Sequence, residues 1–484
     1  MSPLDLRPLL PAVIVTLTAL AALLAQAFTP KGRRAPAAAI SLFGLAAAGV
    51  AVFLLAPAVQ GGRSAVLGGT LVADAYALFL EALILGLGFV AVLFSSQYLR
   101  ETGEDRGEYY ALTLFSIVGM LGLVSATELI SLFVALEIMS VALYALTGFD
   151  RRRPDSQEGA IKYFVTGAFS SAFLLYGVAF LYGIAGSTSL DRIGLALATL
   201  DATHRGMAVL GVGLLLVGFG FKIASVPFHM WAPDVYQGAP TPATGFMAAG
   251  VKAAAFGALL RVLAIALPSL ASHWQPAIAV LAFLTVVIGN LGALAQTNVK
   301  RMLAYSSVAH AGYLLIAACG APRQAASAIL FYLVGYAAVS LGGFGVMAAL
   351  TRDGREPLSL GDMAGLASRR PALAAAFTAF LVSFMGVPVS AGFVGKFYLF
   401  AAAVNAGYTG LAIVGVLMSV VSAFYYLRVV VAMYMKEPVG DDTWAPVGPE
   451  SRLALAVSVA VVLGLGLFPG AVLTLARRAA ESLL

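Results

Sequence analysis

The chain has 484 residues, of which 61% are hydrophobic and only 11% are charged. Soluble proteins carry about 25% charged residues, so this composition excludes a soluble globular protein and predicts a polytopic membrane protein. The net charge of +6 is no sign of nucleic-acid binding, because most basic residues fall in short loops, where they report membrane topology.

The hydrophobic pattern predicts an all-α polytopic membrane protein, with about 14 transmembrane helices in a single transmembrane domain over residues 1–484. The first apolar run, Leu9 to Ala25, precedes Ala25-Gln26-Ala27, which looks like a signal-peptide cleavage site. Asp5 balances Arg7 ahead of this run and the run is long, so we expect a retained first helix. The predicted spans start near Pro8, Pro36, Leu71, Tyr109, Thr127, Gly159, Met207, Thr241, Pro276, Met302, Gln324, Pro371, Tyr408 and Arg452.

Two ionisable residues lie at bilayer depth in the fifth and seventh spans. Glu137 lies midway along the fifth span, and Lys222 lies in the seventh shortly before Pro227, where we expect the helix to break. A charge at the bilayer centre costs roughly 2.5–3.5 kcal/mol on insertion scales, and carbonyl groups freed by a break solvate an ammonium. We interpret the two as a switchable ion pair of a proton relay. The alternatives are a protonated structural glutamate and a snorkelling lysine.

Two further lysines extend this path. Lys252 falls near the centre of the eighth span among small residues, which allow close helix packing and leave room for water. Lys396 ends the stretch Phe384–Lys396 of the twelfth span, which holds Pro388 and several glycines and predicts a second helix break. We therefore expect Lys252 to be a central relay group and Lys396 to be a terminal one.

Two histidines are weaker candidates for the same relay. His229 follows Pro227 near the expected membrane edge, and His310 lies within the tenth span. A lone histidine is more often a satisfied polar residue than a relay group, so the sequence supports both interpretations equally for each.

The two broken spans are five apart in the order of helices, so they enter the membrane from opposite sides. Paired broken helices in inverted halves mark the transport sites of many transporters. The sequence therefore predicts two inverted five-helix repeats, one over residues 109–265 (helices 4–8) and one over residues 276–435 (helices 9–13). Helices 7 and 12 would be the broken ones, at Pro227 and Pro388.

The basic residues of the loops predict the orientation. The loops after odd-numbered spans, including Arg151-Arg152-Arg153, hold more than twice as many lysines and arginines as the loops on the other side. By the positive-inside rule the odd-numbered loops face the cytoplasm, and both termini lie outside.

Redox and nucleotide chemistry have no support in the chain itself. The single cysteine, Cys319, excludes an internal disulfide and any cysteine-based metal or iron–sulfur site. No Walker A or dinucleotide-binding fingerprint is present. We therefore expect neither a cofactor-binding site nor a metal site in this chain.

Two motif blocks connect the chain with a known family. The first contains Lys222, Pro227-Phe228-His229-Met230-Trp231, the run Asp234-Val235-Tyr236-Gln237-Gly238-Ala239-Pro240-Thr241-Pro242, and Lys252. The second contains Asn298 to Ser307 and His310-Ala311-Gly312-Tyr313. Together they resemble the antiporter-like subunits of proton-pumping NADH:quinone oxidoreductase, respiratory complex I, from about the third span onward.

Three features favour the subunit N branch of that family. The Asp-Val-Tyr-x-Gly-Ala-Pro-Thr-Pro run is typical of it. The chain ends soon after the fourteenth span, whereas subunit L carries a long lateral helix. Lys396 stands where subunit M typically has a glutamate.

The resemblance implies a function and a set of partners. Glu137 and Lys222 would be the family's ion pair, Lys252 its central lysine and Lys396 its distal site. Flavin, iron–sulfur clusters and quinone would belong to partner subunits. Subunit M and small membrane subunits would be neighbours in a bacterial inner membrane.

Three alternatives stay open at this point. The first is a subunit of a multi-subunit cation/proton antiporter or of a membrane-bound hydrogenase. The second is an independent solute transporter, and the third is a purely structural membrane subunit.

Overall fold

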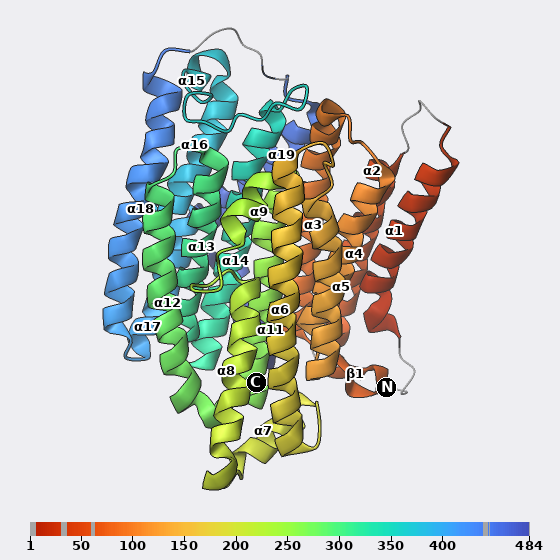
Figure 1. Ribbon diagram of the computed structural model, residues 1–484, viewed down its shortest axis with the longest axis vertical. Helices are drawn as coiled ribbons and strands as arrows, with labels where there is room; N and C mark the ends of the chain where they lie inside the picture. Colours follow the sequence, from red (N-terminus) through yellow and green to blue (C-terminus); the bar gives the residue numbers. More distant parts are fainter. Residues whose placement is uncertain (1–5, 31–35, 60–62, 439–443, 445, 484) are drawn as a thin grey trace.

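The computed structural model describes residues 6–30, 36–59, 63–438, 444 and 446–483, which form an elongated bundle of helices (Figure 1). Twelve helices among these residues are long and apolar enough to cross a membrane. The helix α13 and the pair α16–α17 add two further crossings to the bundle. The predicted all-α membrane fold is thereby confirmed.

The first half of the chain supplies the helices before the eighth crossing. Their bounds are α1 (Leu10–Phe28), α2 (Ala37–Leu55), α3 (Ala75–Thr102), α4 (Gly107–Ser125), α5 (Leu129–Thr147), α6 (Pro154–Ala185), α7 (Leu190–Ala198), α8 (Ala202–Lys222) and α9 (Ala232–Gly238). Single 3₁₀ turns lie at Arg7–Leu9, Ala56–Val59 and Leu67–Gly69.

The eighth and later crossings complete the bundle. The eighth consists of α10 (Thr241–Phe246), a π-helical turn (Met247–Val251), α11 (Lys252–Arg261) and a second π-helical turn (Val262–Ala266). The remaining elements are a 3₁₀ turn (Pro268–Leu270), α12 (Ala271–Leu294), α13 (Val299–Ala318), α14 (Pro322–Leu350), α15 (Leu366–Arg369), α16 (Pro371–Met385), α17 (Ala391–Asn405), α18 (Thr409–Met435), α19 (Pro449–Leu467) and α20 (Gly470–Leu483).

The predicted start of the third span at Leu71 is wrong. Leu71–Ala73 form a strand, β2, which pairs antiparallel with β1 (Ser64–Val66). Gly68 and Gly69 have positive φ and make the turn between the strands. Helix α3 begins only after Asp74, whose carboxylate caps it by accepting from the backbone N–H of Ala77.

The ninth span also begins earlier than the predicted Pro276. Helix α12 starts at Ala271, and Pro276 lies inside it. Pro276 is the sixth residue of α12, beyond the four N–H groups at a helix N-terminus that have no intrahelical acceptor. The helix therefore forgoes one backbone hydrogen bond at this proline and continues through it.

Close helix packing depends on small residues. A Cβ added to Gly289 of α12 would lie 2.6 Å from the backbone nitrogen of Ala309 on α13. A Cβ on Gly312 of α13 would lie 2.6 Å from the backbone nitrogen of Val286 on α12. These reciprocal contacts hold two backbones together as small residues do elsewhere in membrane proteins.

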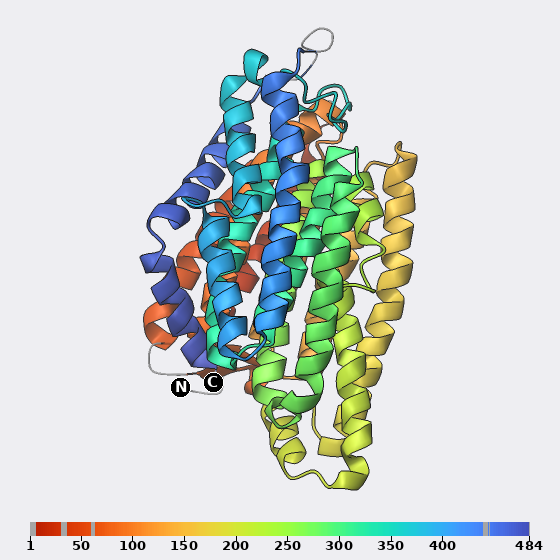
Figure 2. The ribbon, with the colours of Figure 1, turned by 90° about the vertical axis from the view of Figure 1, so that its left-hand side faces the viewer.

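Helix α1 begins and α20 ends at the same end of the bundle, which is also the end where α7 lies (Figures 1 and 2). The segment with α15 lies at the opposite end. This arrangement is the one that an even number of crossings produces. The end where α1 begins and α20 ends is called the terminal end.

Candidate functional site

Lys222 is the last residue of α8, and its side chain is only 2% exposed. Its Nζ donates to the hydroxyl oxygens of Ser140 at 2.7 Å and of Tyr144 at 3.2 Å, both on α5. Glu137, half-buried on the same helix, instead accepts a hydrogen bond from Ser171 of α6. No ion pair joins Glu137 and Lys222 within the described residues, although both side chains meet one face of α5.

Lys396 is the lysine that the carbonyl groups of a broken helix hold. Its Nζ donates to the backbone oxygens of Phe384 at 2.8 Å and Met385 at 3.0 Å, the last residues of α16. It also donates to Ser419 Oγ of α18 at 2.6 Å. The sequence led us to expect such carbonyl ligands at Lys222, where hydroxyl groups are found instead. The difference arises because Lys396 follows its break and reaches back over it.

Lys252 lies in the middle of the eighth crossing, directly after a π-helical turn, and is 1% exposed. Its Nζ donates to the backbone oxygen of Ser307 at 2.6 Å, to the hydroxyl of the same residue, and to Tyr336 OH at 3.2 Å. Single π-helical turns occur frequently at functional sites. Lys252 therefore joins helices α11, α13 and α14 at one buried point.

His310 lies between Lys252 and Lys396, within electrostatic range of both. Its ring nitrogens contact the hydroxyl groups of Tyr332 and, at 3.3 Å, Tyr426. A cavity of about 10 Å³ borders His310, Tyr332 and Tyr336, close to the size that holds one water molecule. The structure thus brings Lys252, His310 and Lys396 into one polar region.

The other predicted residues lie at or near the two helix breaks. Pro227 and the half-buried His229 lie between α8 and α9, and Pro388 lies between α16 and α17. His229 Nδ1 is buried and has no hydrogen-bond partner within the described chain. His229 is therefore not part of the hydrogen-bonded region around His310.

The hydroxyl groups that hold the three lysines were not predicted from the sequence. These are Ser140, Tyr144, Ser307, Tyr336 and Ser419. Helical spacing offered a signal for two of them, since the third and seventh residues after Glu137 share its face of a helix. For the others no local signal exists, because they come from helices distant in sequence.

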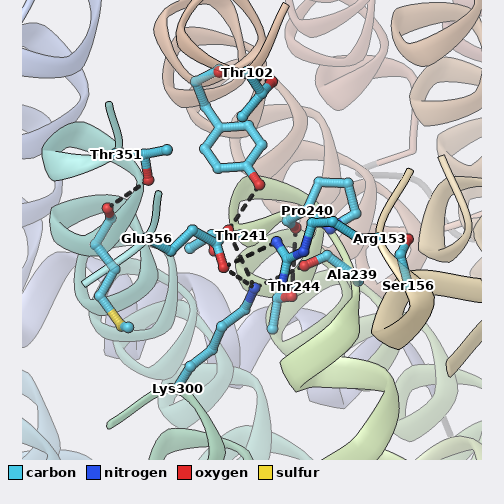
Figure 3. A network of polar contacts seen from close by, with 12 residues as sticks. Thr102, Arg153, Ser156, Ala239, Pro240, Thr241, Thr244, Lys300, Thr351 and Glu356 are labelled. Carbon is cyan, nitrogen blue, oxygen red and sulfur yellow. Dashed lines mark hydrogen bonds and ion pairs between the residues drawn. The ribbon is translucent and has the colours of Figure 1, made fainter. Parts of the chain in front are cut away.

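Figure 3 shows a second polar network. It involves the segment between α14 and α15, at the end of the bundle opposite the terminal end. The buried carboxylate of Glu356 pairs with Arg153 and Lys300, each at 3.2 Å. It also accepts from Tyr98 at 2.7 Å and Thr241 at 2.6 Å. Burial alone would raise the pKa of Glu356, but the two cations and the two hydroxyl donors lower the pKa to about 2.

A neighbouring carboxylate repeats this pattern. Asp234 on α9 pairs with Lys162 of α6 at 2.6 Å and with Arg301 of α13 at 2.7 Å. Arg153 and Lys162 come from the first half of the chain, whereas Lys300 and Arg301 are adjacent residues of the second. Two acidic residues therefore connect the halves at this end.

The arrangement supports proton movement through hydroxyl, imidazole and amine groups. Within the described residues, no three His, Cys, Asp or Glu side chains lie together as a metal site would require. The three lysines are buried on different helices, and each donates hydrogen bonds to hydroxyl or carbonyl oxygens of neighbouring helices.

Comparison with known proteins adds an independent line of evidence. The family described as NADH:quinone oxidoreductase/Mrp antiporter, TM, matches residues 126–422. NADH-quinone oxidoreductase subunit N of Trichlorobacter lovleyi is 43% identical over 99% of this chain and 97% of its own length. The protein of the same description from Chloroflexus aggregans is 42% identical over 98% and 97%.

Solved structures give a consistent result. A chain of respiratory complex I from Thermus thermophilus with bound aureothin is 37% identical, with a TM-score of 0.81 over 96% of this chain and 98% of that one. A chain of the Mrp complex from Dietzia sp. DQ12-45-1b has a higher TM-score, 0.88, over 99% and 98%, but is only 23% identical. At 23% identity, the likeness to the Mrp complex chain concerns the fold alone. The likeness to the complex I chain, at 37% identity, extends to the sequence.

Proposed function

Because the chain belongs to the NADH-quinone oxidoreductase subunit N family, we propose that it is a proton-translocating membrane subunit of a complex I-type enzyme. Quinone reduction takes place in partner subunits, which hold the flavin and iron–sulfur clusters. Other membrane subunits of that enzyme, subunit M among them, are its neighbours in the bilayer. Identity of 43% over the whole chain favours this function over that of a cation/proton antiporter subunit.

The observation that carries the proposal is the buried lysine series. Lys222, Lys252 and Lys396 are each at most 4% exposed, although a cation at this depth is costly. His310 lies within electrostatic range of the second and third lysines, and its ring nitrogens contact the hydroxyl groups of Tyr332 and Tyr426. Glu137 sits on the helix that binds Lys222, so its charge acts on that lysine across a short distance.

The proposed architecture follows from the helix breaks. The gaps between α8 and α9 and between α16 and α17 support two inverted repeats, residues 109–265 and 276–435. The location proposed is a bacterial inner membrane, with both termini outside.

The test replaces lysines with methionine, which preserves length and removes the charge. We expect Lys252→Met to abolish proton uptake by vesicles holding the assembled complex, and Lys396→Met to reduce it less. Water at the break beside Lys396 substitutes in part for a missing amine, whereas Lys252 is carried by a crossing that runs without a break from Thr241 to Ala266. Lys436→Met, an exposed position after α18, is the matched control. Wild-type uptake by the Lys252→Met complex would exclude the function.

A further inference from the structure

A buried carboxyl group outside the lysine series lies in the second turn of α3. Glu81 is 7% exposed, and its Oε1 accepts a hydrogen bond from Ser125 Oγ of α4 at 2.9 Å. Its Oε2 is buried and has no hydrogen-bond partner within the described residues. A buried polar atom left unpaired costs about 1–3 kcal/mol, so such an atom indicates a binding position.

Glu81 and Ser125 line a cavity near the terminal end of the bundle. The centre of a water molecule has about 30 Å³ of free space in it, which is enough for one or two water molecules. The other walls come from the 3₁₀ turn before α1, from the start of α1, from the β1–β2 hairpin and from α4. They are Pro8, Leu9, Ala12, Val66, Leu71, Val72, Leu121 and Gly122. The carboxyl group therefore borders a small cavity beside the β1–β2 hairpin. The hairpin lies at the terminal end of the bundle (Figure 1).

A neighbouring ion pair separates the role of Glu81 from that of Asp74. Arg261 forms two hydrogen bonds with the carboxylate of Asp74, at 2.7 and 3.0 Å, and both side chains are almost fully buried. Asp74 also caps α3. Both oxygens of Asp74 are thus engaged, and its charge is balanced. Glu81 is the carboxyl group of this region that is left to exchange a proton.

Arg261 lies on the helix that carries the central lysine. Lys252 begins and Arg261 ends this helix, α11, about 14 Å apart along its axis at 1.5 Å per residue. Between them, the carbonyl oxygen of Gly257 accepts from the hydroxyl of Tyr76 at 2.9 Å. The guanidinium of Arg261 lies over the Tyr76 ring at 5.0 Å. Tyr76 and Arg261 therefore place polar groups along α11 between Gly257 and the end of the helix, in the part of α11 that follows Lys252.

We propose that Glu81 is a further proton-exchange group, which passes protons between the relay at Lys252 and water at the terminal end. The carboxylate accepts a proton from the relay side and releases it to a water molecule in the cavity, so no charge accumulates. Ser125 positions the carboxyl group by donating to Oε1. This proposal rests on the proposed proton translocation. It adds a branch that starts from Lys252, the middle lysine of the series, and ends at the cavity beside Glu81.

The test uses the assembled complex in vesicles and compares Glu81→Gln with Glu101→Gln, a less buried glutamate on the same helix. We expect Glu81→Gln to lower proton uptake at least fivefold while quinone reduction in the presence of an uncoupler persists. Glu101→Gln should retain wild-type uptake. Infrared difference spectra should contain a protonated-carboxyl band that is absent only from the Glu81→Gln complex.

A second variant, Ser125→Ala, tests the proposal if the Glu81→Gln complex assembles poorly. In Ser125→Ala the carbonyl of Glu81 loses its donor, so the same infrared band should move to higher frequency. An unshifted band, or a band that changes with sodium at constant pH, would overturn the proposal.

Proton uptake also separates this proposal from the one on which it rests. Wild-type uptake by Glu81→Gln beside loss of uptake in Lys252→Met would overturn the role of Glu81 alone. Wild-type uptake by both variants would overturn the proposed function as well.

Discussion

Among single residues, Glu137 and Lys222 interact through helix α5 rather than by a direct contact. Lys222 binds Ser140 and Tyr144 rather than Glu137, and Glu137 accepts from Ser171. A small shift of either side chain along α5 would exchange these partners, since all three α5 residues share one face. The pairing inferred from the sequence is thus one of two arrangements that the same helix face allows.

Replacing Glu137 with glutamine tests this coupling. Glutamine keeps an oxygen for Ser171 and removes the charge, so we expect assembly to persist and proton uptake to fall about tenfold, which corresponds to about 1.4 kcal/mol of lost coupling. Proton uptake per quinone reduced is the measurement, with Glu108→Gln, an exposed glutamate of α4, as the control. Unchanged uptake in Glu137→Gln would assign that carboxyl group a structural role.

At the scale of elements, the break between α16 and α17 shapes the site of Lys396. Gly386 follows α16 with φ +83°, and a Cβ added to it would lie 2.9 Å from Cδ of Lys396. A left-handed backbone costs a residue other than glycine about 1–2 kcal/mol. Two requirements therefore favour glycine at position 386. The backbone there is left-handed, and the side chain of Lys396 leaves no room for a Cβ.

Two alanine variants separate these requirements. Gly407 has φ +87° and open space around its Cα, so Gly407→Ala carries only the backbone cost. We expect Gly386→Ala and Gly407→Ala each to lose about 1–2 kcal/mol of unfolding free energy. Only Gly386→Ala should also reduce proton uptake, because it displaces Lys396. Equal uptake by the two variants would show that the lysine tolerates the displacement.

The Glu356 network connects α3, α6, α10 and α13 to the segment after α14, and its stability should depend on pH. The pKa of Glu356 is about 2 in the folded protein, against an ordinary value of 4.5. A lowered carboxyl pKa stabilises the fold fully above the ordinary value, and that contribution is lost as the pH falls towards 2.

Glu356→Gln should therefore be destabilised most at neutral pH. Breaking a buried ion pair costs about 3–5 kcal/mol, and here two cations lose their partner. Thermal unfolding of both proteins between pH 7 and pH 3 is the measurement, and the difference should shrink as the pH is lowered. A difference that is constant with pH would show that the charge of Glu356 contributes nothing to it.

The sequence predicted the elements better than their contacts, for a physical reason. Lysines at bilayer depth and prolines within apolar runs are costly in lipid, so Lys252 and Pro388 stood out. Lys300 stands just before the predicted start of the tenth span at Met302, where charged loop residues are ordinary, yet it is fully buried against Glu356. The β1–β2 hairpin was missed because its strands are as apolar as the helix that follows. Partners such as Tyr336 come from distant helices, and no local pattern encodes them.

At the scale of the whole molecule, the two ends of the bundle differ in chemistry. The end with α15 holds the ion pairs of Glu356 and Asp234, which involve residues from both halves of the chain. The terminal end holds the Asp74–Arg261 pair and the cavity beside Glu81. Because loops with excess lysine and arginine remain in the cytoplasm, the first end should face the cytoplasm.

Cysteine labelling tests this orientation in intact cells. Cys319 is buried and free, so a Cys319→Ala background removes the native thiol at small structural cost. Arg151 and Arg205 are both exposed and lie before α6 and near the start of α8, at opposite ends of the bundle. We expect a membrane-impermeant maleimide to label Arg205→Cys in intact cells and Arg151→Cys only after the membrane is opened. The reverse pattern would invert the topology and place the cavity of Glu81 on the cytoplasmic side, where it would serve proton uptake instead of release.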